Sequence, residues 1–174
     1  MPPPLPHPAP TERLTFRRAT LADAPFFVEL MNSPGWLRNI GDRNVHNETD
    51  AVQYLTDRIL PAYQIPGCGP MLCRLKTDGT IIGNTGVYER PGLDVPDFGF
   101  AFLPDYHGKG YAYEASVSHL AFAEAHGHTE LLAITLPANG ASLRLLRKLD
   151  FRDDGVITLP NDEVELLLLR WVVG

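Results

Sequence analysis

Apolar and polar positions follow two different periods along the N-terminal third of the chain. Leu14 to Arg18 alternates between them, as a half-buried strand does. Thr20 to Asp23 then offers helix-start residues before the apolar run from Phe26 to Met31, and Asn32 to Gly35 holds residues that end a helix. A second helix is predicted from Glu48 to Pro61, where apolar residues recur at helical spacing. This part of the chain therefore predicts a strand followed by two helices.

The middle of the chain has the pattern of antiparallel strands. The runs Met71 to Lys76 and Thr80 to Glu89 are joined by Thr77-Asp78-Gly79, a short turn typical of a hairpin. Phe98 to Leu103 predicts a further strand of the same series.

Beyond Pro104 the helical period returns. Gly108 and Gly110 introduce a helix with an apolar face of mostly small residues, and Gly127 ends it. The remaining predicted elements are an apolar strand, a short amphipathic helix and a final strand, over Leu131 to Leu136, Ser142 to Leu149 and Glu165 to Val173.

Together these elements predict an α+β domain. Its central sheet should be mixed and mostly antiparallel, flanked by helices, with at least one parallel pair across the helix that starts at Gly110. The length of 174 residues and a hydrophobic content of 44% suit one domain, over residues 11–174. Residues 1–10 contain five prolines and predict a flexible tail.

Charge and cysteine content exclude several function classes. The net charge of −6 lacks the basic footprint of a nucleic-acid-binding protein, and no stretch approaches the roughly 20 apolar residues of a membrane span. Cys68 and Cys73 have no companion residues at metal-ligand spacing, so we expect no metal. Two free thiols without a signal sequence favour a reducing, cytoplasmic location.

The segment from Phe98 to Ala112 is the strongest candidate for chemistry. It joins a strand, a loop with Gly108 and Gly110, and a helix start, where unpaired N–H groups and the helix dipole favour an anion. A P-loop is excluded because Gly110 follows Lys109 in place of Ser or Thr, and the dinucleotide fingerprint lacks its third small residue. The pattern predicts a pyrophosphate site that belongs to neither ATP nor NAD.

His107-x-x-Gly110-x-Ala112 resembles the acetyl-CoA loop of the GNAT acetyltransferase family, although His107 stands where Gln or Arg is usual. Asn139-x-x-Ser142, with the downstream residues to Phe151, resembles that family's second coenzyme motif, and Asn32 to Leu55 resembles its branch that acetylates ribosomal-protein N-termini. The likeness covers about residues 12–173 and implies the GNAT fold, acetyl-CoA as cosubstrate, and a monomer or homodimer.

The resemblance also implies which residues hold the coenzyme. The strand main chain of Phe100, Ala101, Phe102 and Leu103 would pair with pantetheine as an added strand. The loop N–H groups would hold the pyrophosphate, and Asn139 and Ser142 would hold the pantetheine end. Lys109, Arg144 and Arg147 are candidates for the adenosine phosphates, or are ordinary solvated charges. The loop residues concerned are His107, Gly108, Lys109, Gly110, Tyr111 and Ala112.

Acetyl transfer requires an amine that has lost its proton, and a donor for the departing thiolate. Asp97 is the candidate base, directly or through water, although an Asp at a strand end also commonly binds a turn. The family's usual Tyr is replaced by Leu146, so Ser142 is the candidate acid, its alternative role being a helix N-cap. Trp36 and Tyr88 either line the acceptor pocket or belong to the core.

Two further residues are interpreted from their positions. His119 lies on the small apolar helix face and is predicted to be a core histidine. Asp150 replaces the family's glycine before Phe151, at a point where the chain needs a left-handed conformation.

These observations predict an N-acetyltransferase that works by direct attack in a ternary complex. The acceptor is a protein N-terminus or a small-molecule amine such as an antibiotic or a polyamine. A non-catalytic acyl-CoA sensor and a nucleotide-binding regulatory domain are the alternatives. The loops that select the acceptor carry no pattern that identifies it.

Overall fold

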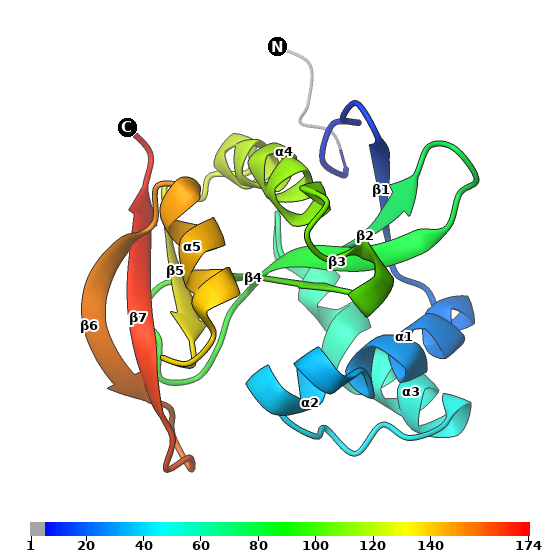
Figure 1. Ribbon diagram of the computed structural model, residues 1–174, viewed down its shortest axis with the longest axis horizontal. Helices are drawn as coiled ribbons and strands as arrows, with labels where there is room; N and C mark the ends of the chain where they lie inside the picture. The colour runs from blue at the N-terminus through cyan, green and yellow to red at the C-terminus, as the bar shows by residue number, and fades with distance from the viewer. Residues whose placement is uncertain (1–5) are drawn as a thin grey trace.

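A seven-stranded sheet forms the centre of the computed structural model, which describes residues 6–174 (Figure 1). Its strand order is β1-β2-β3-β4-β5-β7-β6. The strands are β1 (Leu14–Arg18), β2 (Gly69–Leu75), β3 (Ile81–Tyr88), β4 (Asp97–Phe102), β5 (Glu130–Thr135), β6 (Arg152–Thr158) and β7 (Glu165–Val172).

Helices connect the strands at both ends of the chain. Between β1 and β2 lie the 3-10 turn η1 (Leu21–Asp23), α1 (Ala24–Met31), α2 (Pro34–Asn39), α3 (Glu48–Tyr54), the π-helical η2 (Leu55–Ile59) and the 3-10 helix η3 (Leu60–Gln64). After β4 come the 3-10 turn η4 (Pro104–Tyr106), α4 (Tyr111–Ala125) and α5 (Gly140–Lys148).

The pairing within the sheet confirms a mixed, mostly antiparallel α+β fold. Adjacent strands pair antiparallel except β4 and β5, which are parallel and are joined through α4. The predicted hairpin is the β2–β3 pair. Its turn is closed by a hydrogen bond from the Leu75 N–H to the Thr80 carbonyl at 2.9 Å, and Gly79 takes a φ of +77° that suits glycine.

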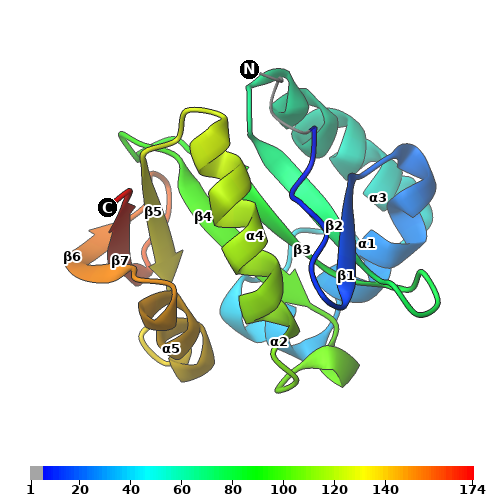
Figure 2. The ribbon, with the colours of Figure 1, turned by 90° about the horizontal axis from the view of Figure 1, so that it is seen from above.

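Two helical layers cover the sheet on opposite faces (Figures 1 and 2). Because strand side chains alternate, Phe98 and Phe102 of β4 pack under α4, while Ala101 and Leu103 pack against the layer of α1 to α3. The sheet is therefore buried on both sides along β4, the strand that carries the candidate site.

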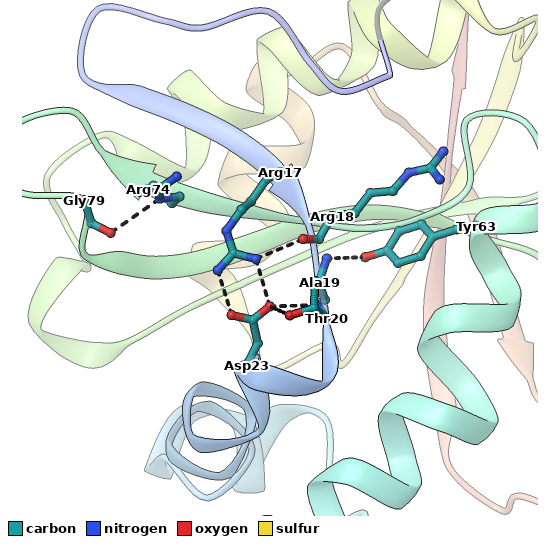
Figure 3. A network of polar contacts seen from close by, with 8 residues as sticks. All are labelled: Arg17, Arg18, Ala19, Thr20, Asp23, Tyr63, Arg74 and Gly79. Atoms are coloured by element: carbon teal, nitrogen blue, oxygen red, sulfur yellow. Dashed lines mark hydrogen bonds and ion pairs between the residues drawn. The ribbon is translucent and has the colours of Figure 1, made fainter.

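An ion pair with a buried carboxylate fixes the start of the α1 layer (Figure 3). Arg17 of β1 donates two hydrogen bonds to Asp23, at 2.7 and 2.8 Å, and the Asp23 carboxylate also accepts from the Thr20 N–H at 2.7 Å. The side chain of Asp23 is 6% exposed. Burial alone would raise the pKa of Asp23, but these hydrogen bonds lower it below its ordinary value.

Three elements differ from the sequence prediction. Pro34 begins α2 within the segment expected only to end a helix, because proline suits the first helical position. Strand β6 was not predicted, since its polar sequence lacks the apolar alternation of a half-buried strand, and its pairing with β7 forms it. The helix predicted from Ser142 starts at Gly140.

The flexible tail expected over residues 1–10 stays a prediction, and residues 1–5 lie outside the described part of the chain. Of the rest, Pro8 is buried and the Ala9 carbonyl accepts a hydrogen bond from Ser118 of α4 at 2.6 Å. Within residues 6–174, no helix combines the length and apolarity that crossing a membrane requires.

Candidate active site

Strands β4 and β5 touch at one end and then diverge. Asp97 lies opposite Leu132, whose N–H donates to the Pro96 carbonyl at 2.9 Å, and the described residues show no further register pair between these strands. Figure 1 shows the two strands leaving this point in different directions, with α4 and α5 on one face of the opening. The divergence leaves an edge of β4 unpaired in the interior of the sheet.

The register of β4 decides which of its residues face that opening. The Leu103 N–H donates to the Ile82 carbonyl of β3 at 2.8 Å, so every second main-chain position along β4 is turned toward β3. Phe98, Phe100 and Phe102 consequently turn their N–H and C=O groups toward β5. Of the four residues from Phe100 to Leu103 expected to pair with pantetheine, only Phe100 and Phe102 have main-chain groups that face the opening.

The glycine loop continues directly from this strand end. Gly108 and Gly110 have φ values of +71° and +82°, and a Cβ built at Gly108 would meet no atom within 4 Å. Helix α4 begins after Gly110 without a capping side chain, and its first helical hydrogen bond runs from the Glu114 N–H to the Gly110 carbonyl. The N–H groups of Tyr111 and Ala112 therefore have no partner within the helix.

Two other helices of the chain, α3 and α5, have their N-termini capped by side chains, whereas α1 and α2, like α4, have no such cap. Asn47 accepts from the Asp50 N–H at 2.8 Å at the start of α3, and Asn139 accepts from the Ser142 N–H at 3.2 Å at the start of α5. An uncapped, exposed helix start with two left-handed glycines beside it fits a bound diphosphate, because the phosphate oxygens would accept hydrogen bonds from the free N–H groups.

The basic residues near the loop are placed differently from one another. Arg147 is bound to Asp153 of β6 through two hydrogen bonds at 2.8 and 3.1 Å. Lys109 has its ammonium 5.9 Å from the Tyr106 ring centre. The His107 ring contacts the Phe102 carbonyl through Nε2 at 2.7 Å, so this side chain fastens the loop to the end of β4.

Helix α5 carries the second predicted coenzyme motif. Because Asn139 caps this helix, the alternative that Ser142 is the N-cap is wrong, and the half-buried Ser142 side chain is not used for that purpose. Leu146 is 2% exposed and belongs to the core. The Lys148 ammonium lies 4.0 Å above the Tyr113 ring, which links α5 to α4 above the opening between the strands.

Asp97 lies at the start of β4, where the strands part. Its carboxylate accepts from Nε and Nη2 of Arg90 at 3.1 and 3.3 Å, and its side chain is 4% exposed. Burial raises the pKa of Asp97, and the Arg90 guanidinium offsets only part of that rise. The carboxylate is thus a stronger base than a solvated aspartate, and it is held by a guanidinium rather than by a turn.

Tyr88 is the cross-strand partner of Asp97 and lies on the same face. Its ring covers the paired glycines Gly86 and Gly99: a Cβ at Gly86 would overlap the ring, and one at Gly99 would lie 3.8 Å from it. Burial raises the pKa of the Tyr88 phenol, which is therefore neutral. The Tyr88 ring therefore packs over these two glycines, beside the candidate base Asp97.

Trp36 lies in the helical layer on that face. Its indole N–H donates to the Gly41 carbonyl at 3.1 Å, and its ring packs against the cluster that includes Ala101 and Leu103. Trp36, Tyr88 and Asp97 therefore lie on the face of the sheet opposite α4, so a coenzyme entering along α4 and an acceptor beside Tyr88 would approach from opposite sides.

His119 is confirmed as a core residue. It is fully buried, its Nδ1 lies 2.7 Å from Oγ1 of Thr85, and the rings of Phe98 and Phe122 meet it edge-on. Burial lowers its pKa to about 3, with a smaller contribution from the neighbouring histidines. Among residues 6–174, no three His, Cys, Asp or Glu side chains are grouped as metal ligands.

Sequence reasoning missed three residues that hold the site together. Arg90 pairs with Asp97, and Arg13 and Glu114 bind one another beside the glycine loop. Glu114 carries a weak sequence signal as an acidic residue in the first turn of a helix. The two arginines carry none, because their partners are found only once the strands are in register.

Comparison with known proteins agrees with this geometry. The sequence profile of the "Acetyltransferase (GNAT) domain" family matches residues 13–152. The chain is 32% identical over 83 residues to an uncharacterized N-acetyltransferase, YnaD, of Bacillus subtilis strain 168. That alignment covers 47% of this chain and 48% of the relative, so the match spans about half of the relative's length.

Solved structures share the fold. An acetyltransferase from Agrobacterium tumefaciens superposes with a TM-score of 0.79 at 24% identity, over 94% of this chain and 93% of that one. RimL, a ribosomal L7/L12 alpha-N-protein acetyltransferase solved in complex with coenzyme A, gives 0.81 at 14% identity, over 96% and 98%. With the profile match over most of its length, the chain belongs to the GNAT family of acetyl-CoA-using N-acetyltransferases.

Proposed function

We propose that this chain transfers the acetyl group of acetyl-CoA to a primary amine, with a peptide N-terminus as the preferred acceptor. The observation that carries the proposal is the continuity of an unpaired β4 edge with the uncapped start of α4. Such a site offers main-chain donors to an extended chain and to a diphosphate at its end, which is the shape of coenzyme A.

Acetyl-CoA supplies a thioester whose carbonyl carbon is open to attack by an amine. The amine nitrogen forms the new C–N bond, the C–S bond breaks, and one proton moves from nitrogen while another reaches sulfur. Asp97, made more basic by burial, accepts the proton from the amine, directly or through one water. Main-chain N–H groups at the opening polarise the carbonyl.

Ser142 is the proposed proton donor to the sulfur, since Leu146 cannot serve. Its hydroxyl is available because Asn139 already caps α5. Changing Ser142 to Ala should lower kcat at least about tenfold while leaving the affinity for coenzyme A within a factor of about two. An unchanged kcat would remove Ser142 from this role and leave solvent as the donor.

Binding of the acceptor is assigned to the face of Trp36 and Tyr88, opposite α4. The preference for a peptide N-terminus is supported by the similarity in fold to RimL. Small-molecule amines such as antibiotics and polyamines are the second candidate class, since every primary amine offers the same nucleophile.

A non-catalytic acyl-CoA sensor is the competing proposal, and the absence of a tyrosine at Leu146 is the observation that favours it. A sensor would bind coenzyme A and release no thiol with any amine. The two proposals therefore differ in turnover and agree in binding.

The test incubates the chain with acetyl-CoA and a panel of peptides, polyamines and aminoglycosides, and measures thiol release and the mass of the products. We expect acetylated peptide N-termini. Gly110→Asp should abolish coenzyme binding by placing a like charge at the phosphates, whereas Gly127→Asp, also at a positive φ but at the far end of α4, should not. Binding without turnover on every amine would favour the sensor.

Direct attack requires that no cysteine carry the acetyl group. Cys68 and Cys73 are both buried free thiols, and burial raises the pKa of Cys68 to about 11. A stable acetyl-cysteine required for turnover would contradict the mechanism. Free thiols also fit the cytoplasmic location, which belongs to this proposal together with a monomeric or homodimeric state.

A further inference from the structure

Arg13, the residue before β1, lies against the glycine loop from outside. Its Nη1 donates to the Lys109 carbonyl at 3.0 Å, its Nε donates to Oε1 of Glu114 at 2.8 Å, and its guanidinium lies 4.1 Å above the Tyr111 ring. A single side chain thus contacts the loop, the first helical residue and the first turn of α4.

The partner of Arg13 is itself held by several donors. The Glu114 carboxylate accepts from the Arg13 main-chain N–H at 3.0 Å and from the Thr11 hydroxyl at 2.5 Å. Burial alone would raise the pKa of Glu114, but these hydrogen bonds and the Arg13 charge lower it, so the carboxylate stays ionised at neutral pH. The side chain of Glu114 is 19% exposed and that of Arg13 is 38% exposed.

A loop with two left-handed glycines is otherwise free to move. Glycine has more backbone freedom than any other residue, so ordering Gly108 and Gly110 only when a ligand arrives would reduce the affinity. Arg13 fixes the Lys109 carbonyl between these two glycines. The planar guanidinium is suited to hold a carbonyl and a carboxylate at once.

The opposite charges of Arg13 and Glu114 offset one another, so the pair acts on the loop through its geometry. The negative charge of Glu114, in the first turn of α4, interacts favourably with the helix dipole but would repel a phosphate bound at the same helix start. Arg13 neutralises that charge, so the pair as a whole neither attracts nor repels an anion strongly. Its effect on a ligand must come from the shape that it gives the loop.

We propose that Arg13 is a positioning residue for the coenzyme, which pre-orders the loop from Gly108 to Ala112 through Lys109 and Glu114. The inference rests on the proposed function of the loop. It predicts a change in coenzyme affinity and in the KM for acetyl-CoA, with little change in kcat at saturating acetyl-CoA.

The test compares Arg13→Met with Arg17→Met in the full chain. Arg17 lies on β1, pairs with a carboxylate through two side-chain hydrogen bonds, and is similarly exposed at 35%. Its partner Asp23 belongs to the α1 layer, far from the loop in sequence (Figure 3). Arg17→Met therefore controls for the loss of an ion pair on this strand.

We expect Arg13→Met to raise the Kd for coenzyme A about tenfold or more by calorimetry, equivalent to about 1.4 kcal/mol. Its loop amides should exchange hydrogen faster than those of the wild type. Arg17→Met should lower the Tm at least as much and keep the Kd within about twofold. An unchanged Kd for Arg13→Met overturns the inference.

Arg13→Lys provides a second test, because lysine keeps the positive charge and the fold but lacks the planar guanidinium that holds a carbonyl and a carboxylate at once. It should weaken coenzyme binding about fivefold or more, and binding equal to the wild type would show that charge alone matters and overturn the positioning role. Failure of the wild type to bind coenzyme A would instead contradict the proposed function, so failure of the Arg13 inference and failure of the proposed function are distinguishable.

Discussion

Asp97 on β4 lies opposite Leu132 on β5 at the point from which these two parallel strands diverge. The residue proposed to take the proton from the amine therefore stands at the closed end of the opening, and the glycine loop stands at its other end. The length of β4, from Asp97 to Phe102, separates the proposed chemistry from the proposed phosphate site.

The glycine loop can be tested with two matched glycines. Gly108 and Gly127 both have a positive φ, of +71° and +92°, and a Cβ at either would meet no atom within 4 Å. Changing either to Ala should cost about 1 kcal/mol of stability through backbone strain. Only Gly108→Ala should also weaken coenzyme A binding, by about tenfold in calorimetry. Equal affinities would argue against the loop as the phosphate site.

Asp97→Asn should lower kcat about 100-fold or more and leave the Kd for coenzyme A nearly unchanged, because the amide cannot take a proton. Asp23→Asn is the matched control, since Asp23 is also buried and bound by an arginine. Both changes should lower the Tm, and only the first should slow thiol release. In the wild type, kcat should fall as pH drops through the raised pKa of Asp97. A normal kcat in Asp97→Asn would exclude the proposed base.

The buried His119 should make the fold sensitive to mild acid. Its pKa is lowered to about 3 in the folded chain, against 6.5 as its ordinary value, so the unfolded chain binds the extra proton first as pH falls. The contribution of His119 to the free energy of unfolding should be fully present above about pH 6.5 and should decline as the pH falls toward 3. The free energy of unfolding should drop by roughly 2 kcal/mol between pH 7 and 5. Urea unfolding at both pH values should show this loss, and His119→Gln should reduce it. Equal pH dependence in both proteins would contradict this account.

Asp150 carries strain that glycine would relieve. It has a φ of +69°, and it ends α5 in a turn in which its N–H donates to the Arg147 carbonyl and the Phe151 N–H donates to the Leu146 carbonyl, both at 3.0 Å. Asp150→Gly should stabilise the chain by about 0.5–1 kcal/mol, or about 1–4 °C in Tm by calorimetry. Asn161→Gly, at a φ of +63°, should give a similar gain. A lower Tm in both variants would show that the strain is absent.

Local sequence patterns predicted strands, helices and turns well where neighbouring residues alone determine the structure. The alternation at Leu14 to Arg18, the Asp-Gly turn of the β2–β3 hairpin and the left-handed position of Asp150 are all confirmed. Each depends on the chemistry of adjacent residues. Strand β6 and helix α2 were missed, since pairing with β7 forms the first and a proline misread as a stop begins the second.

The features of the candidate site likewise divide into those that local sequence patterns predicted and those that they did not. The sequence by itself determined the glycine loop, the strand before it and the helix after it, because steric freedom at glycine and the unpaired N–H groups of a helix start are local properties. Only the tertiary structure decided that Phe100 and Phe102 turn their main chain to the opening, that Arg90 holds Asp97, and that Arg13 reaches Glu114 across 101 positions of sequence. These contacts depend on strand register and on packing between distant segments, which no local pattern encodes.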